Sequence, residues 1–85
     1  MNNLQTLRDL RSELGYSTTF VGKKIGVSHA SVSRWETAYD SPKIDKILDL
    51  AIAYETTPEK ILRCWINTQK THIDRSVYNR GQLAA

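Results

Sequence analysis

Four side chains that can donate hydrogen bonds to a nucleic acid lie close together in the first half of this chain. They are His29, Ser31, Ser33 and Arg34. Hydroxyl, imidazole and guanidinium groups suit phosphate oxygens and base edges, and a bidentate arginine on guanine is the commonest specific contact with DNA. These residues can do that chemistry only if one helix presents them together on its exposed side.

The surrounding residues predict such a helix, together with a partner helix and a tight turn. Ser17 and Ser28 are of the type that caps helix N-termini, so we expect helices over about residues 18–25 and 29–37. Gly26 suits a positive φ in the turn between them. Two short helices joined by a glycine-containing turn form a helix-turn-helix, whose second helix lies in the major groove of DNA.

Both helices have apolar positions suited to an inward face. Val21 and Ile25 lie four residues apart in the first, and Val32 and Trp35 lie three apart in the second. Gly22 is costly inside a helix unless space is needed there. We expect this glycine to let the two helices cross closely.

Three further amphipathic helices are predicted around this pair. The first ends at Gly15, a residue type common just past helix ends. The fourth should begin with Ser41 as N-cap and Pro42 as its first residue, and the fifth repeats this chemistry at residues 57–59. Their apolar positions are Leu4, Leu7, Leu10 and Leu14 in the first helix, Ile44, Ile47, Leu48, Leu50, Ala51 and Tyr54 in the fourth, and Ile61, Leu62, Trp65 and Ile66 in the fifth.

The predicted domain covers residues 1–67, and residues 68–85 form a polar C-terminal tail, which we expect to be mobile or associated with a dimer. Ile73 and Val77 in that tail fit either a further helical turn or a short strand. Apolar residues at adjacent positions of the fifth helix make its stripe broader than one packed face requires. We therefore expect a homodimer interface formed by Leu62, Trp65, Ile66, Ile73 and Val77, although the helix-five residues would also serve to close a monomer core.

Bulk composition narrows the function classes. The net charge of +3 and the pI near 9.2 permit nucleic-acid binding without requiring it. No apolar run approaches the length of a membrane span, and the N-terminus lacks a signal pattern, so a cytoplasmic protein is expected. Cys64 is the only cysteine, which excludes an intrachain disulfide and a cysteine-based metal site.

The sequence shows no residues arranged for catalysis or for binding a cofactor. Ser28 and Ser31 lack a paired base and an orienting acid at a suitable spacing, and no glycine-rich phosphate loop is present. No second metal-ligating residue lies at a suitable spacing from His29, because His72 is far along the chain. We expect a protein that is not an enzyme and has no metal, cofactor or small-molecule ligand.

With these residues in place, the chain resembles the Cro/CI-type, XRE-like helix-turn-helix family of phage repressors and bacterial regulators. The resemblance spans roughly residues 4–62 and depends on the order and spacing of its motifs. These are Leu10-Arg11, Ser17, Val21-Gly22, Gly26-Val27-Ser28, Val32-Ser33-Arg34-Trp35-Glu36, Pro42, and Thr57-Pro58-Glu59-Lys60-Ile61-Leu62. The family implies a five-helix fold like that of the lambda repressor DNA-binding domain.

The same resemblance implies roles for individual residues. Base reading falls to His29, Ala30 and Arg34, with Ser31 and Ser33 close by. Contacts with DNA phosphates are expected from Ser17, Thr18, Ser28, Thr37 and Lys43. Arg11 and Glu36 match an ion pair that braces the recognition helix, and such a pair, if partly exposed, contributes about 0–1 kcal/mol.

Four positions depart from the family pattern. Thr18 stands where a glutamine is common, which removes a long amide able to reach phosphate. Gly22 stands where alanine is usual, which we expect to be a mild change. Ala38 replaces a usual glycine after the recognition helix, so that helix could end differently. Phe20 occupies a usually polar position, where the tail or a partner could cover it.

The sequence therefore predicts a DNA-binding transcriptional regulator, most simply a repressor, that binds a pseudo-palindromic operator as a homodimer. An antitoxin or a controller of a restriction system would have the same fold and also bind DNA. A protein-interaction module without DNA affinity is a third reading. A genomic neighbour that encodes a toxin or a nuclease would favour an antitoxin or a restriction controller over a repressor. The absence of salt-sensitive DNA affinity would favour the protein-interaction module.

Overall fold

Five helices, with no strand between them, make up the part of the chain that the structure describes. This computed structural model describes the backbone of residues 4–84 and the side chains of residues 4–72. The helices are α1 (Leu7–Glu13), α2 (Thr18–Ile25), α3 (His29–Glu36), α4 (Ile44–Ala53) and α5 (Pro58–Ala84). The prediction of an all-α fold is confirmed. None of the described helices is both long enough and apolar enough to pass through a membrane.

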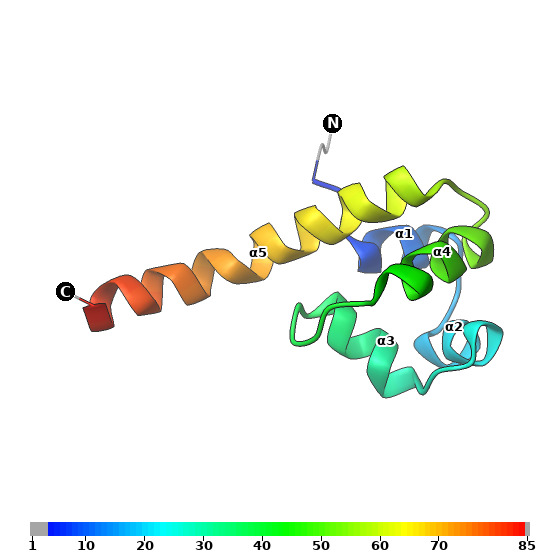
Figure 1. Ribbon diagram of the computed structural model, residues 1–85, viewed down its shortest axis with the longest axis horizontal. Coiled ribbons are helices and arrows are strands. Elements are labelled where there is room, and N and C mark those ends of the chain that lie inside the picture. The colour runs from blue at the N-terminus through cyan, green and yellow to red at the C-terminus, as the bar shows by residue number, and fades with distance from the viewer. Residues whose placement is uncertain (1–3, 85) are drawn as a thin grey trace.

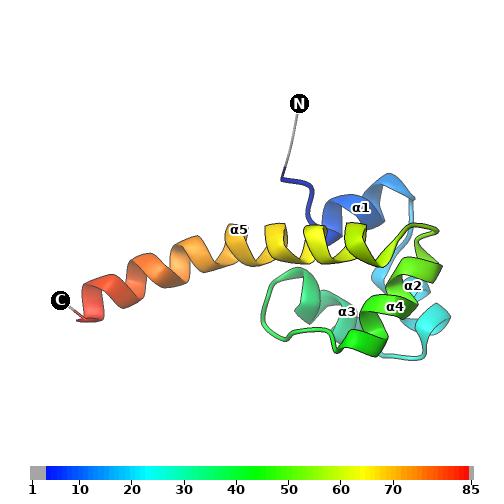
Figure 2. The same cartoon turned by 45° about the horizontal axis from the view of Figure 1, so that its top comes forward.

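The core lies where the first half of α5 packs on α1, α3 and α4, and α2 joins it by packing on α3 and α4. Val21, Val32, Leu50 and Ile61, from four different helices, are each at most 1% exposed. Figure 2 shows α1 on one side of α5 and α3 and α4 on the other. The second half of α5 extends away from the other helices (Figure 1).

Helix α1 begins later than its leucine stripe suggested. Thr6 and Asp9 form a capping box: the Thr6 hydroxyl accepts from the Asp9 amide, and the Asp9 carboxylate accepts from the Thr6 amide. This cap fixes the first helical residue at Leu7. Leu4 therefore lies before the helix and Leu14 at its end, and both are exposed, at 52% and 39%. The expectation that these two leucines share the buried stripe is wrong.

Helix α4 also begins later than predicted. Lys43, not Ser41, is its N-cap, and the amides of Lys46 and Ile47 both donate to the Lys43 carbonyl. Pro42 is buried in the preceding loop instead of forming the first turn. Proline suits a helix start, but here its fixed φ serves the loop that leads out of α3.

The buried face of α4 is narrower than its apolar sequence indicated. Ile47, Leu50 and Ala51 are buried as predicted, whereas Ile44 and Leu48 are 70% and 48% exposed. Three apolar residues spaced four apart lie on one flank of α4, and all of them are exposed: Ile44, Leu48 and Ile52. They lie just outside the stripe that reaches the core, so counting apolar residues overestimated the buried face.

Helix α5 continues through Ala84, so the short-strand alternative for the tail is wrong. Thr68 interrupts the apolar pattern yet is fully buried. Its hydroxyl donates to the Cys64 carbonyl and accepts from the Leu7 amide, at 2.8 and 3.0 Å. The neighbouring Asn67 amide donates to the Gln5 carbonyl at 2.9 Å. These polar side chains bind the start of α1, which is why the helix needs them on a buried face.

Candidate nucleic-acid interface

The turn between α2 and α3 is set by capping residues and one left-handed glycine. The Ser17 hydroxyl accepts from the Phe20 amide, and the Ser28 hydroxyl accepts from the Ser31 amide. Gly26 ends α2 with φ 78°, a conformation that disfavours side chains. The helix bounds and both N-caps predicted for this pair are confirmed, except that α3 ends at Glu36 and Thr37 is its C-cap.

Gly22 permits the close approach of the two helices. A Cβ atom at this position would lie 2.6 Å from the Val27 carbonyl oxygen and 3.2 Å from the His29 amide nitrogen. Both contacts are with backbone atoms of the turn and the first residue of α3. The replacement of the usual alanine is therefore not mild, because an alanine would displace the start of α3.

Helix α3 has a buried side and an exposed side, as a recognition helix requires. Val32 and Trp35 are 1% and 6% exposed and hold the helix on the core. His29, Ser33 and Arg34 are exposed. The residues predicted to read bases are His29, Ala30, Ser31, Ser33 and Arg34, and four of them line one hollow of about 440 Å3. The exception is Ser31, which lies within 3.2 Å of the Ser28 hydroxyl.

Tyr39 lines the same hollow and was not predicted from the sequence. Tyr39 is 76% exposed, and the Arg34 guanidinium carbon lies 5.7 Å from the centroid of its ring. The guanidinium is thus placed over an aromatic face. The available signal was an aromatic residue in the loop that directly follows a predicted recognition helix.

The residues expected to contact phosphates differ in their free hydrogen-bonding capacity. Ser17 and Ser28 use their hydroxyl oxygens as cap acceptors. The Ser28 hydroxyl also shares a hydrogen bond of 3.2 Å with the Ser31 hydroxyl, whereas the Ser17 hydroxyl keeps its proton for another partner. The Thr37 hydroxyl instead donates to the carbonyls of Ser33 and Arg34. Thr18 is partly exposed at the start of α2, and Lys43 is exposed at the start of α4.

The ion pair expected between Arg11 and Glu36 is formed. Arg11 Nε lies 2.6 Å from Glu36 Oε2, and Arg11 Nη2 lies 2.9 Å from Oε1. Arg11 Nη1 also donates to the Tyr16 carbonyl at 2.8 Å. The hydrogen bond to Glu36 raises the pKa of Arg11. The side chains are only 15% and 7% exposed, so the pair is more enclosed than expected, and its contribution to stability stays a prediction.

The exit from α3 keeps a left-handed residue although the usual glycine is missing. Ala38 has φ 58°, and the Tyr39 amide then donates to the Arg34 carbonyl at 2.9 Å. The alanine therefore adopts a conformation that favours glycine, with a cost from its Cβ atom. Phe20, the other departure on an exposed surface, contacts Tyr16 with ring centroids 4.8 Å apart.

The residues proposed for dimerisation divide into three groups. Leu62 and Ile66 on α5 are 40% and 48% exposed, as an interface requires. Trp65 is partly buried and packs against the monomer core, so only part of its ring remains for a partner. Ile73 and Val77 lie outside the residues whose side chains the structure describes.

Comparison with known protein families matches residues 7–61 to a helix-turn-helix family. The match contains α1 to α4 and the first residues of α5, and so includes the Arg11–Glu36 pair, the turn at Gly26 and the whole of α3. Comparisons with curated proteins and with solved structures returned no match. Since the family match covers more than half of the chain and agrees with the observed helices, the chain belongs to the XRE-like, Cro/CI-type helix-turn-helix family of DNA-binding regulators.

Proposed function

We propose that this protein is a transcriptional repressor that binds a pseudo-palindromic operator as a homodimer. The observation that carries the proposal is the exposed side of α3, where His29, Ser33 and Arg34 project from a helix held by Val32 and Trp35. An arginine at this place is suited to guanine O6 and N7, and the small neighbours leave room for base edges. The contact of Arg34 with Tyr39 would orient the guanidinium before DNA binds.

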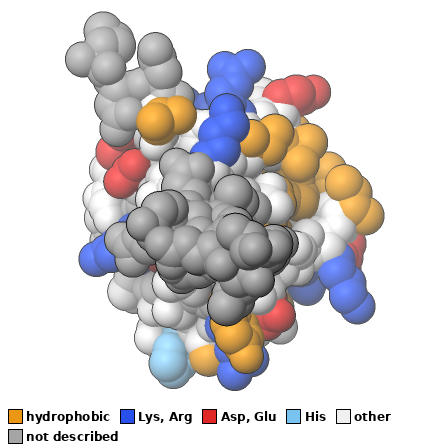
Figure 3. All heavy atoms as spheres, turned by 90° about the vertical axis from the view of Figure 1, so that its left-hand side faces the viewer, with side chains coloured by type: hydrophobic (Ala, Val, Ile, Leu, Met, Phe, Trp, Pro, Cys, Tyr) orange, Lys and Arg blue, Asp and Glu red, His pale blue; other side chains and the backbone are white. Residues whose placement is uncertain are grey.

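Dimerisation follows from the reach of one recognition helix. A single helix contacts only a few base pairs, and two helices one DNA turn apart give adequate affinity and specificity. Leu62 and Ile66 supply exposed apolar surface on α5 for this purpose. Figure 3 shows one group of exposed hydrophobic side chains at the right-hand side of the face that it displays. Repression is the simplest outcome, because a bound dimer blocks access to the promoter.

Selection of bound fragments from the source genome, followed by footprinting, tests the proposal. We expect enriched fragments to share an inverted repeat with half-sites about 10 base pairs apart, located at promoters. Affinity should fall steeply as the salt concentration rises. The absence of any enriched site, or affinity that does not respond to salt, would favour a protein-interaction module instead.

The dimer interface can be tested with a matched pair of variants. Ile66→Glu places a charge on the exposed stripe of α5, and Ile52→Glu places one on the exposed flank of α4. We expect Ile66→Glu to sediment as a folded monomer and to bind the operator weakly, while Ile52→Glu stays dimeric. A dimeric Ile66→Glu variant at micromolar concentration would place the interface elsewhere, and a monomeric Ile52→Glu variant would place it on α4.

A further inference from the structure

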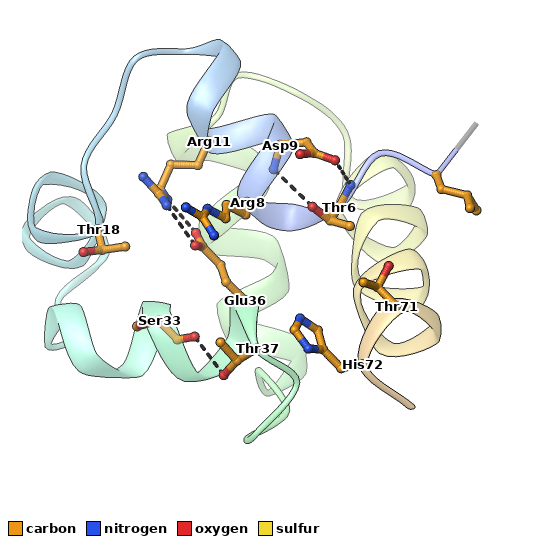
Figure 4. Close-up of a pocket in the computed structure, with 11 residues that line it drawn as sticks. Thr6, Arg8, Asp9, Arg11, Thr18, Ser33, Glu36, Thr37, Thr71 and His72 are labelled. Carbon is orange, nitrogen blue, oxygen red and sulfur yellow. Dashed lines mark hydrogen bonds and ion pairs between the residues drawn. The ribbon is translucent and has the colours of Figure 1, made fainter. Parts of the chain in front are cut away.

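A second hollow, of about 630 Å3, lies beside α3, and most of the residues that line it are of polar or charged types. Thr18 at the start of α2, Ser33 and Thr37 on α3, Arg8 on α1 and His72 on α5 all line it. In Figure 4 these side chains surround one open space, with Arg8 and His72 on either side of Glu36 and Thr37. Neither Arg8 nor His72 belongs to the helix-turn-helix.

We propose that this hollow binds the sugar–phosphate backbone of DNA next to the bases contacted by α3, with the Arg8 guanidinium and the His72 imidazole as hydrogen-bond donors to a phosphate. The inference rests on the proposed function and adds to it a phosphate site outside the helix-turn-helix. Phosphate oxygens accept hydrogen bonds from guanidinium, imidazole and hydroxyl groups, and these are the groups present.

Two arginines, Arg8 and Arg11, and two acidic residues, Asp9 and Glu36, line the hollow, and only Arg11 and Glu36 form an ion pair with each other among the described residues. Glu36 is the acidic group on α3, but both of its oxygens bind Arg11 and its side chain is only 7% exposed. Asp9 on α1 directs a carboxylate oxygen to the Thr6 amide as part of the capping box. Arg8 and His72 have no hydrogen bond or ion pair with the residues that the structure describes. Within the described part of the chain, their donor groups are therefore not used by other residues.

The position of the hollow fits a DNA strand that passes along α3. Ser33 and Thr37 line both this hollow and the hollow formed by His29, Arg34 and their neighbours. Thr18 and Thr37, both expected to contact phosphates, also line it. A strand whose bases face Arg34 would therefore bring its phosphates across the mouth of the second hollow, toward Arg8 and His72.

The contribution of α5 sets this chain apart from the part that matches the family. The matched residues end at 61, whereas α5 continues and carries His72 beside Thr37. Thr71 lines the same hollow, but its hydroxyl donates to the Asn67 carbonyl within the helix. His72 is thus the group that α5 offers to a phosphate.

The test measures how the DNA affinity of the full chain depends on salt concentration. Each phosphate contact contributes about 0.9 to the slope of log K against log salt concentration. We expect Arg8→Gln to reduce the slope by about one contact, and Arg8→Gln and His72→Gln each to weaken binding several-fold on specific and on random DNA alike. Arg63→Gln, which removes an exposed charge of α5 outside the hollow, serves as the control and should leave the slope unchanged.

The outcomes separate this inference from the proposed function. If the wild-type chain binds DNA and Arg34→Ala weakens that binding, but Arg8→Gln leaves the slope unchanged and His72→Gln leaves the affinity unchanged, the phosphate site is refuted and the proposed function stands. If the wild-type chain binds no DNA, both are refuted. Inorganic phosphate that saturably shifts the His72 resonance in free protein, with the slope of Arg8→Gln and the affinity of His72→Gln unchanged, would show a site for a small anion and would also overturn the proposal.

Discussion

Arg11 of α1 and Glu36 at the end of α3 are joined by two parallel hydrogen bonds of 2.6 and 2.9 Å. The same guanidinium donates a third bond to the Tyr16 carbonyl, which lies just before α2. One side chain therefore connects the scaffold helix, the recognition helix and the entrance to α2. The orientation of α3, and hence of its exposed side, depends on this connection.

Loss of either partner should destabilise the fold strongly. Glu36→Ala leaves a mostly buried guanidinium without its carboxylate, which costs about 3 kcal/mol in the free energy of unfolding. The double variant Arg11→Ala/Glu36→Ala should be less destabilised than the sum of the single variants. Denaturant unfolding of the four proteins in a double-mutant cycle measures the coupling. Additive effects would contradict the role given to the pair.

Ala38→Gly should stabilise the protein. Ala38 holds φ at 58°, where a Cβ atom meets the backbone, and glycine removes that conflict. We expect the free energy of unfolding to rise by about 1 kcal/mol. The reverse change at the other turn, Gly26→Ala, should lower it by a similar amount because Gly26 has φ 78°. A melting temperature of Ala38→Gly below that of wild type would contradict the strained conformation.

Gly22→Ala tests the close contact between α2 and the start of α3. The added Cβ atom would lie 2.6 Å from the Val27 carbonyl oxygen, so the backbone must move. We expect a loss of about 1–3 kcal/mol in stability, together with amide chemical-shift changes concentrated at residues 27–29. Wild-type stability with unchanged shifts would show that the turn adjusts freely.

Stability should fall at alkaline pH because of Tyr54, a buried residue at the end of α4. Burial, with a smaller effect from Glu36, raises the pKa of Tyr54 above its ordinary value of 10.0. A raised pKa in the folded state means that the stabilising contribution is present below pH 10 and is lost as the pH rises above it. Tyr54→Phe should weaken this decline, whereas Tyr39→Phe, on an exposed ring, should not. Equal alkaline unfolding of both variants and wild type would contradict the assignment.

The helix-turn-helix could be predicted from the sequence because its determinants are local. Ser17, Gly26 and Ser28 each act on backbone groups within three or four residues, so their types and spacing reveal their roles. The same holds for the alternation of buried Val32 and Trp35 with exposed Ser33 and Arg34. Recognition of the ion pair at Arg11 and Glu36 needed a family pattern, because the residues are 25 positions apart.

The features that the sequence did not reveal depend on how distant segments meet. Thr68 looked like the start of a polar tail, yet it binds the Leu7 amide 61 residues earlier. Leu48 has the same hydropathy as buried leucines, but it lies on the flank of α4 that no other helix covers among the described residues. Arg8 and His72 are far apart in the sequence, and they border one hollow only because α1 and α5 both lie beside α3.

The affinity of Arg34→Ala for the selected operator is the most direct test of the recognition surface. The account predicts a loss of about 1–3 kcal/mol in specific binding, relaxed preference at one base position of each half-site, and an unchanged melting curve. Binding to random DNA should fall far less. An Arg34→Ala variant that folds normally and binds the operator with wild-type affinity and specificity would contradict the assignment of α3 as the base-reading helix.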